Sequence, residues 1–238
     1  MLFDTHLHLI YPDRLRYPWL KNLEVLNKPS KYEEYQLLAK RLGISSCFHM
    51  EVDVAEEQII DETNLIEEIT HQSKTLLRGV ISACRPEYEN FPKFLDWANE
   101  QSLIKGFRRV LHVVPDEISQ TELFRNNVKR LSETKLTFDL CVSSRQLPLT
   151  YELVDYCPEV TFVLDHCGVP DIQSNDFHDW APKILELSKR NNVYCKISGI
   201  IAYGNPVFWT LDELRPYFEH AISSFGHDRI VWGSDSPV

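Results

Sequence analysis

The sequence lacks the motifs of several protein classes. None of its six cysteines belongs to a Cys-x-x-Cys pair, so a zinc-ribbon or thioredoxin-type site has no support. No Gly-x-Gly-x-x-Gly or Walker-type loop is present, and a nucleotide-binding Rossmann domain is therefore not indicated. No apolar stretch approaches the roughly 18 residues of a membrane span. Asp4 and His6 interrupt the N-terminus before an apolar region of signal-peptide length could form, and we therefore expect no signal peptide.

Positive charge is also scarce. The chain has 25 lysines and arginines against 35 aspartates and glutamates, a formal net charge of -10. Its basic residues form only short pairs, such as Arg108-Arg109 and Lys189-Arg190. Because such a chain repels phosphate backbones and anionic membranes, we expect a small-molecule substrate and neither a nucleic-acid nor a membrane partner. The sequence does not indicate an oligomeric state.

The cysteines point to a reducing compartment. Five of the six lie in or beside apolar segments, and we expect reduced, buried thiols. Such thiols are typical of a cytoplasmic protein.

The sequence does contain a regular series of short apolar segments, rich in β-branched and aromatic residues. Eight of them predict strands: Met1–Phe3 leading into His6, Ile44–Met50, Leu76–Ala83, Ile104–Leu111, Leu136–Val142, Val160–Leu164, Val193–Ile197 and Ile230–Trp232. Helical patterns lie between them, at Tyr32–Leu42, Ile59–Ile69, Phe91–Ala98, Leu123–Leu131, Trp180–Leu187 and Leu211–Phe218. Trp97, Trp180 and Trp209 fit helix faces packed on a sheet.

Alternating strands and helices predict parallel βαβ units. Eight evenly spaced strands favour a closed barrel, and 238 residues are close to the roughly 250 that a (β/α)8 barrel needs. We therefore predict an α/β protein with one (β/α)8 (TIM) barrel domain over residues 1–238. The connection from Tyr11 to Lys31 is long and contains three prolines, and we expect it to build the active-site face.

The C-terminal end of the predicted barrel is incomplete. The eighth predicted strand is followed by only a few residues, up to Val238. A complete barrel needs a helix to cover its last strand. We therefore expect that the final helix is missing and that the chain is truncated.

Three residues predict a metal site where the barrel closes. His6 and His8 are two apart in a strand and therefore point to the same side, and paired imidazoles suit zinc and related ions. Asp235 follows strand 8, which lies beside strand 1 in a closed barrel. Its carboxylate could bind a metal or act as general base on water. The alternatives are half-exposed histidines at a strand end and a turn-forming aspartate before Ser236-Pro237.

Further polar residues lie at strand ends. His166, after Asp165, could bind a metal or polarise a carbonyl, or be a structural histidine. Arg108 in strand 4 shares the parity of Gly106; an interior arginine needs an anion, which could be a substrate group or a structural partner. Glu51 and Arg85 end strands 2 and 3, where a barrel keeps substrate-binding groups.

Together these stretches resemble the amidohydrolase-related family that includes L-fuconolactonase, L-rhamnonolactonase and 2-pyrone-4,6-dicarboxylate lactonase. The matching stretches run in family order: Phe3-Asp4-Thr5-His6-Leu7-His8, Arg14-Leu15-Arg16-Tyr17-Pro18-Trp19-Leu20, Lys105-Gly106-Phe107-Arg108-Arg109, Val163-Leu164-Asp165-His166-Cys167-Gly168, Cys195-Lys196-Ile197-Ser198-Gly199 and Arg229-Ile230-Val231-Trp232-Gly233-Ser234-Asp235. The Arg-Tyr-Pro-Trp-Leu stretch is similar to the sugar-lactonase branch.

The resemblance implies hydrolysis of a cyclic ester. It implies that His6, His8, His166 and Asp235 surround the reacting carbonyl, and that Arg108 binds the substrate. One departure matters: many relatives with two metal ions have a histidine after strand 5, where this chain has Asp139-Leu140-Cys141-Val142. The resemblance therefore implies one divalent ion, zinc before others, or none.

Our hypothesis is a lactonase that opens a sugar-acid lactone with activated water. Its catalytic residues are Asp235 and His166, its metal ligands are His6, His8 and Asp235, and its substrate-binding residues are Arg108, Glu51 and Arg85. Three alternatives stay open. They are a metal-dependent decarboxylase of an aromatic acid, a TatD-like nuclease suggested by the same strand-1 and strand-8 motifs, and a non-catalytic incomplete barrel.

Overall fold

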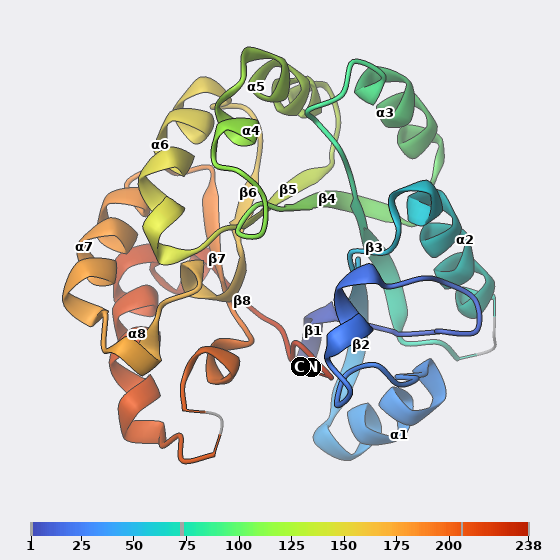
Figure 1. Cartoon of the computed structure of the whole chain (residues 1–238), viewed down its shortest axis with the longest axis horizontal. Helices are drawn as coiled ribbons and strands as arrows, with labels where there is room; N and C mark the ends of the chain where they lie inside the picture. Colours follow the sequence, from blue (N-terminus) through green and yellow to red (C-terminus); the bar gives the residue numbers. More distant parts are fainter. Residues whose placement is uncertain (1, 72–73, 206, 238) are drawn as a thin grey trace.

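The computed structural model describes residues 2–71, 74–205 and 207–237. Met1 and Val238, the ends of the predicted domain, lie outside the described residues. Eight parallel strands follow one another around the sheet in chain order (Figure 1). They are β1 (Leu2–Leu7), β2 (Ile44–Met50), β3 (Leu77–Ala83), β4 (Ile104–Val110), β5 (Thr137–Cys141), β6 (Phe162–Leu164), β7 (Val193–Ile197) and β8 (Ile230–Trp232). β2, β7 and β8 have the predicted bounds.

The segment after β8 brings the sheet round to β1. The backbone N–H of Asp235 donates to the carbonyl of His6 at 2.8 Å, and that of His8 donates to the carbonyl of Ser236 at 2.9 Å. The buried Asp4 carboxylate accepts from the Ser234 N–H at 2.8 Å and from the Ser234 hydroxyl at 2.6 Å. These bonds confirm the predicted (β/α)8 barrel and fix Asp235 beside β1.

The helices lie around the outside of the strands (Figure 1). They are α1 (Tyr32–Leu42), α2 (Ile59–Thr70), α3 (Phe91–Glu100), α4 (Glu117–Gln120), α5 (Glu122–Lys129), α6 (Leu147–Tyr156), α7 (Phe177–Leu187) and α8 (Leu211–Phe225). α4 and α6 were not predicted. α6 contains a proline in its first turn and has weak apolar periodicity. Within the described chain, which runs to Pro237 here, no helix follows β8.

Two apolar clusters form the core. One surrounds β1–β3 with α1 and α2, and the other surrounds β4–β7 with α3 and α5–α8. Trp180 is fully buried in the second cluster and Trp97 packs against it. The prediction for Trp209 was wrong: it precedes α8 and is 45% exposed, because its segment lies outside the helix. All six cysteines are buried and none forms a disulfide, as predicted.

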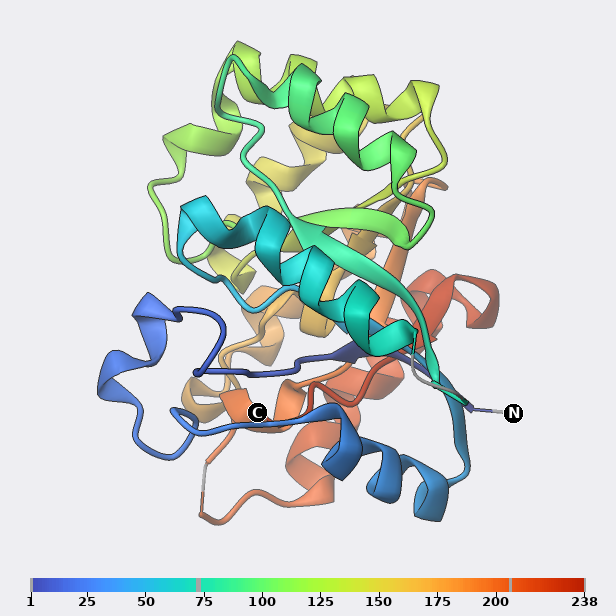
Figure 2. The same ribbon diagram turned by 90° about the vertical axis from the view of Figure 1, so that its right-hand side faces the viewer.

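The connection between β1 and α1 extends beyond the barrel at the end opposite the N-terminus (Figure 2). It contains a short 3-10 helix, Pro18–Asn22, with a proline in its first turn. The parallel strands run toward this end, where a barrel of this type carries its active site. Across the described residues, no helix is long and apolar enough to cross a membrane.

Candidate active site

A cavity of about 270 Å³ opens at the carboxyl ends of the strands. Residues that follow β1, β2, β4, β6, β7 and β8 meet there with the ends of β4 and β5 and with two residues of the β1–α1 connection. The lining residues are His8, Ile10, Trp19, Leu26, Val52, Asp53, Arg108, Val110, His112, Val113, Cys141, His166, Tyr203 and Asp235. The cavity therefore combines apolar walls with a few convergent polar groups, as small-molecule sites do.

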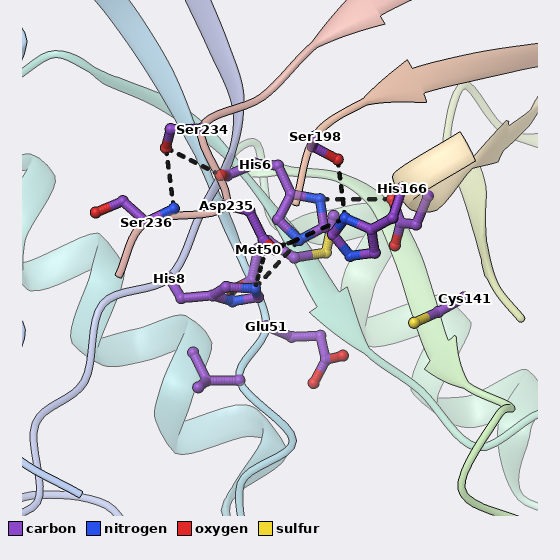
Figure 3. Close-up of polar contacts among 12 residues, drawn as sticks. His6, His8, Met50, Glu51, Cys141, His166, Ser198, Ser234, Asp235 and Ser236 are labelled. Carbon is purple, nitrogen blue, oxygen red and sulfur yellow. Dashed lines mark hydrogen bonds and ion pairs between the residues drawn. The ribbon is translucent and has the colours of Figure 1, made fainter. Parts of the chain in front are cut away.

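His8 and Asp235 line this cavity, and the fully buried His6 lies against both of them (Figure 3). The Nε2 atoms of His6 and His8 are 3.1 Å apart, and each lies 3.3 Å from Asp235 Oδ1. All three side chains are at least nine-tenths buried. The structure thus brings together the three predicted metal ligands. We call them the cavity cluster.

The protonation states leave this cluster rich in lone pairs. Nδ1 of His8 lies 3.0 Å from the Met50 carbonyl, and in the tautomer in which Nδ1 donates to this carbonyl, Nε2 carries a lone pair. Burial, reinforced by Lys196, lowers the pKa of His6. Burial alone would raise the pKa of Asp235, but the neighbouring imidazoles outweigh it and lower that pKa below its usual range. Asp235 is therefore a carboxylate.

These groups fit a divalent cation. Two ligand atoms of a tetrahedral zinc ion, each about 2.0–2.1 Å from the metal, lie roughly 3.3–3.4 Å apart. The separations in the cavity cluster are 3.1–3.3 Å. Nδ1 of His6 faces Asp165 Oδ1 at 3.5 Å, the carboxylate–histidine arrangement that supports metal ligation. His6, Asp165 and His166 form a second group of potential ligands within 4.8 Å of one another.

His166 occupies a sharp turn after β6. Its φ is 51°, a left-handed conformation that non-glycine residues rarely adopt outside functional sites. Its Nδ1 lies 3.0 Å from the Ser198 hydroxyl and 3.8 Å from Asp235 Oδ2. Burial lowers its pKa, so the ring is neutral. His166 therefore borders the cavity cluster and lines the cavity.

Gly199 makes this approach feasible. Its φ is 56°, and a Cβ atom built on it would collide with the Asp235 carboxylate and with Nδ1 of His166. A side chain at this position would have to displace the Asp235 and His166 side chains. Gly199 belongs to one of the family stretches, but the sequence alone assigned it no role.

Of the two neighbouring arginines in β4, Arg108 points inward and lines the cavity. Nε donates to Glu51 Oε1 at 2.6 Å, and Nη2 donates to the Glu51 carbonyl at 2.8 Å. Nη1 lies 3.4 Å from His6 Nε2 and 3.5 Å from Asp165 Oδ2. Much of the hydrogen-bonding capacity of the Arg108 guanidinium is therefore used by partners within the protein.

Glu51 and Arg85 do not lie on the cavity wall. Glu51 is 1% exposed and holds Arg108 in place. Arg85 lies 3.6 Å from Asp53 Oδ1 and 3.4 Å from Glu56 Oε2, and lines a second hollow beside α3. Their predicted contact with substrate is therefore not supported by the geometry, which gives both residues protein partners.

A second polar group below His6 was not predicted. Lys196 is 2% exposed, and its Nζ lies 2.5 Å from Asp139 Oδ2, 2.8 Å from Asp165 Oδ1 and 3.3 Å from His6 Nδ1. Burial raises the pKa of Asp139 to about 7, against the opposing effect of Lys196. We call Lys196, Asp139 and Asp165 the interior cluster. The sequence did contain a signal for this cluster, because each of two otherwise apolar strands has one charged residue: Asp139 in β5 and Lys196 in β7.

Comparison with known proteins identifies the family of this chain. The sequence profile of the amidohydrolase family matches residues 3–238. The chain belongs to the amidohydrolase family. This confirms the resemblance drawn from the motifs.

Two relatives of this amidohydrolase have names that describe lactone-hydrolysing enzymes. An L-fucono-1,5-lactonase of Burkholderia ambifaria is 35% identical over 103 residues, 43% of this chain and 35% of that enzyme. The match thus spans about a third of its length. A 4-sulfomuconolactone hydrolase of Rhizobium radiobacter is 28% identical over 99% of this chain and 75% of its own.

A solved structure has the same fold. An amidohydrolase of Burkholderia multivorans with bound zinc superimposes with a TM-score of 0.88 over 100% of this chain and 84% of its own. The two sequences are 22% identical, so the likeness concerns the barrel alone.

Proposed function

We propose that this amidohydrolase opens a lactone of a sugar acid by adding water to its carbonyl carbon. The observation that carries the proposal is the convergence of His6, His8, His166 and Asp235 beside one cavity. The relatives named L-fucono-1,5-lactonase and 4-sulfomuconolactone hydrolase support the same type of reaction.

Asp235 is the general base in this proposal. Its Oδ1 belongs to the cavity cluster, and its Oδ2 faces His166 and is open to accept a proton from water. That proton later passes to the ring oxygen as the ester bond breaks, so the products are a hydroxyl and a carboxylic acid. The left-handed backbone of Asp235, with φ 58°, holds the carboxylate in the cavity.

His166 stabilises the carbonyl oxygen. When the Ser198 hydroxyl donates to Nδ1, the proton of the neutral ring lies on Nε2 and can be donated to substrate. Such a donor stabilises the negative charge that develops on the oxygen during attack. Arg108 orients the substrate from the wall of the cavity.

One zinc ion is the proposed cofactor, with His6, His8 and Asp235 as its ligands. Bound there, it would lower the pKa of water and polarise the carbonyl. The convergent lone pairs support it, as does the zinc bound by the Burkholderia multivorans amidohydrolase. We further propose a small-molecule substrate, a cytoplasmic location and one barrel domain over residues 1–238.

A pH-indicator assay with a panel of aldonolactones tests the proposal. Asp235→Asn and His166→Asn should each lower kcat/KM by about 10²–10⁴-fold, because each loses a group that moves or donates a proton in the transition state. His178→Asn, on the exposed side of α7, is the matched control and should keep full activity. Full activity in both active-site variants, or release of carbon dioxide from an aromatic acid in place of lactone opening, contradicts the proposal.

A further inference from the structure

Asp53 shares an unusual backbone conformation with the two reaction residues. Seven described non-glycine residues have positive φ, and three of these line the cavity: Asp53 at 45°, His166 at 51° and Asp235 at 58°. Backbone strain of this kind persists where the surroundings hold a side chain in a functional position. His166 and Asp235 have roles in the proposed reaction, whereas Asp53 has none.

Two neighbouring side chains, Glu51 and Arg85, hold Asp53 in position. Its backbone N–H donates to Glu51 Oε2 at 2.6 Å, so the same buried carboxylate that holds Arg108 also fixes the Asp53 turn. Arg85, which does not line the cavity, lies 3.6 Å from Asp53 Oδ1. The Asp53 side chain is 31% exposed, so acceptor positions of its carboxylate are open to the cavity.

Trp19 offers apolar surface to the same cavity. Its indole N–H donates to the Val52 carbonyl at 2.8 Å, directly before Asp53 in the chain. The only donor of this side chain is therefore used, and what remains for a ligand is the ring. The ring is partly exposed, and Ile10 and Leu26 line the cavity with it. An aromatic surface beside a carboxylate suits a ring that has both C–H and O–H groups.

The charge of the cavity disfavours an anionic substrate. Among the described residues of its wall, Arg108 is the one lysine or arginine, and its guanidinium already faces Glu51 and Asp165. Two carboxylates, Asp53 and Asp235, lie on the same wall. A carboxylate or sulfonate substituent close to Asp53 would meet repulsion there, because the lining has no unpaired lysine or arginine among its described residues and the proposed zinc lies at the other carboxylate, Asp235.

We propose that Asp53 is a specificity-determining residue that accepts hydrogen bonds from ring hydroxyls of a neutral lactone lying against Trp19. This inference rests on the lactone hydrolysis proposed above and selects the hydroxylated, uncharged members of that substrate class. Arg85 and Glu51 act through Asp53 as positioning residues. Opening the ring creates a carboxylate, which Asp53 repels, and this favours release of the product.

Asp53→Gly is the sharpest test. Glycine adopts positive φ without strain, so the substitution removes the carboxylate and keeps the backbone. We expect kcat/KM for a neutral aldono-1,5-lactone to fall about 30- to 100-fold, because hydrogen bonds to a charged acceptor are lost. For δ-valerolactone, which has no hydroxyls, the decrease should stay below about threefold. Asp53→Asn, which keeps an acceptor oxygen, should lie between Asp53→Gly and the wild type.

The control is Asn175→Gly, another exchange to glycine at a left-handed position, with φ 55°, on the exposed surface. It should behave as the wild type. Equal losses for both lactones in Asp53→Gly, or no loss for either, overturn the inference.

A binding measurement separates this inference from the proposed reaction. A 1,5-anhydrohexitol has the hydroxylated ring but no ester, so calorimetric titration reports the Asp53 contact without catalysis. If the wild type hydrolyses neither lactone, the proposed function fails. The inference then stands if Asp53→Gly weakens anhydrohexitol binding at least about tenfold, and falls if the affinity is unchanged or if the wild type does not bind it.

Discussion

The interior cluster adjoins the cavity cluster at His6, but the two clusters differ in the source of positive charge. At the interior position, the carboxylates of Asp139 and Asp165 accept from the ammonium of Lys196. Around the cavity position, Nε2 of His6, Nε2 of His8 and Asp235 face one another at 3.1–3.3 Å. Arg108 Nη1 lies 3.4 Å from His6 Nε2 on this side of the ring, but Arg108 is paired with Glu51.

This difference indicates what each cluster does. Buried acceptors need a cation or a proton, because an uncompensated buried charge is costly. The interior cluster receives its cation from the chain and is closed to the cavity. The cavity cluster is open to small molecules and has a donor set that fits a metal from outside. We therefore propose that the interior cluster positions His6 and that the cavity cluster carries out the proposed reaction.

The largest expected effect comes from breaking the interior cluster. Lys196→Met leaves two buried carboxylates without their ammonium, and we expect the free energy of unfolding to fall by about 3–5 kcal/mol. Urea denaturation followed by circular dichroism measures it. The control is Lys189→Met, an exposed lysine paired with Glu186, which should change stability by less than about 1 kcal/mol. Equal stabilities of the two variants would refute the structural role of the interior cluster.

A smaller effect is expected from crowding the cavity cluster. Gly199→Ala places a methyl group against Asp235 and His166, and displacement of reacting groups by about 1 Å can lower kcat about 100-fold. Gly43→Ala is the matched control, since Gly43 is also left-handed, at φ 74°, but a Cβ atom added to it would have nothing within 4 Å. Both variants carry the same backbone strain. If they lose equal activity, strain and not the clash is responsible.

The smallest effect is expected where the two clusters meet at Arg108. Glu51→Gln keeps an acceptor for Arg108 Nε but removes the charge that holds the guanidinium. We expect kcat/KM for the lactone to fall about tenfold, the loss of one charge-assisted hydrogen bond. Glu87→Gln makes the same change to the partner of Arg109, outside the cavity, and should leave kcat/KM unchanged. A larger loss in Glu87→Gln than in Glu51→Gln would contradict this assignment.

Most of the barrel could be predicted from local patterns. Buried parallel strands appear as short apolar segments, and amphipathic helices such as α1 and α8 have clear periodicity. Helix α6 was not predicted because its apolar residues are spread around the helix and give weak periodicity. The bounds of β1 and β6 shifted because pairing with neighbours, not composition, decides where a strand ends.

The candidate site was predictable only in part. His6, His8 and Asp235 could be placed together because strand parity and barrel closure are general rules. Lys196, Asp139 and Asp53 could not, because their roles depend on contacts between strands far apart in sequence. The roles of Glu51 and Arg85 also required the structure: both follow strands near the site, yet Glu51 is turned toward Arg108 and Arg85 is paired with Asp53.

Zinc content per chain tests the contrast between the two clusters most directly. The protein is stripped with a chelator, reloaded with zinc, freed of excess ion and analysed by mass spectrometry of the metal. We predict one zinc per chain in the wild type and in Asp139→Asn, and a loss of at least about tenfold in affinity in Asp235→Ala. A wild type that takes up no zinc, or an Asp235→Ala variant that retains it while Asp139→Asn loses it, would contradict the account.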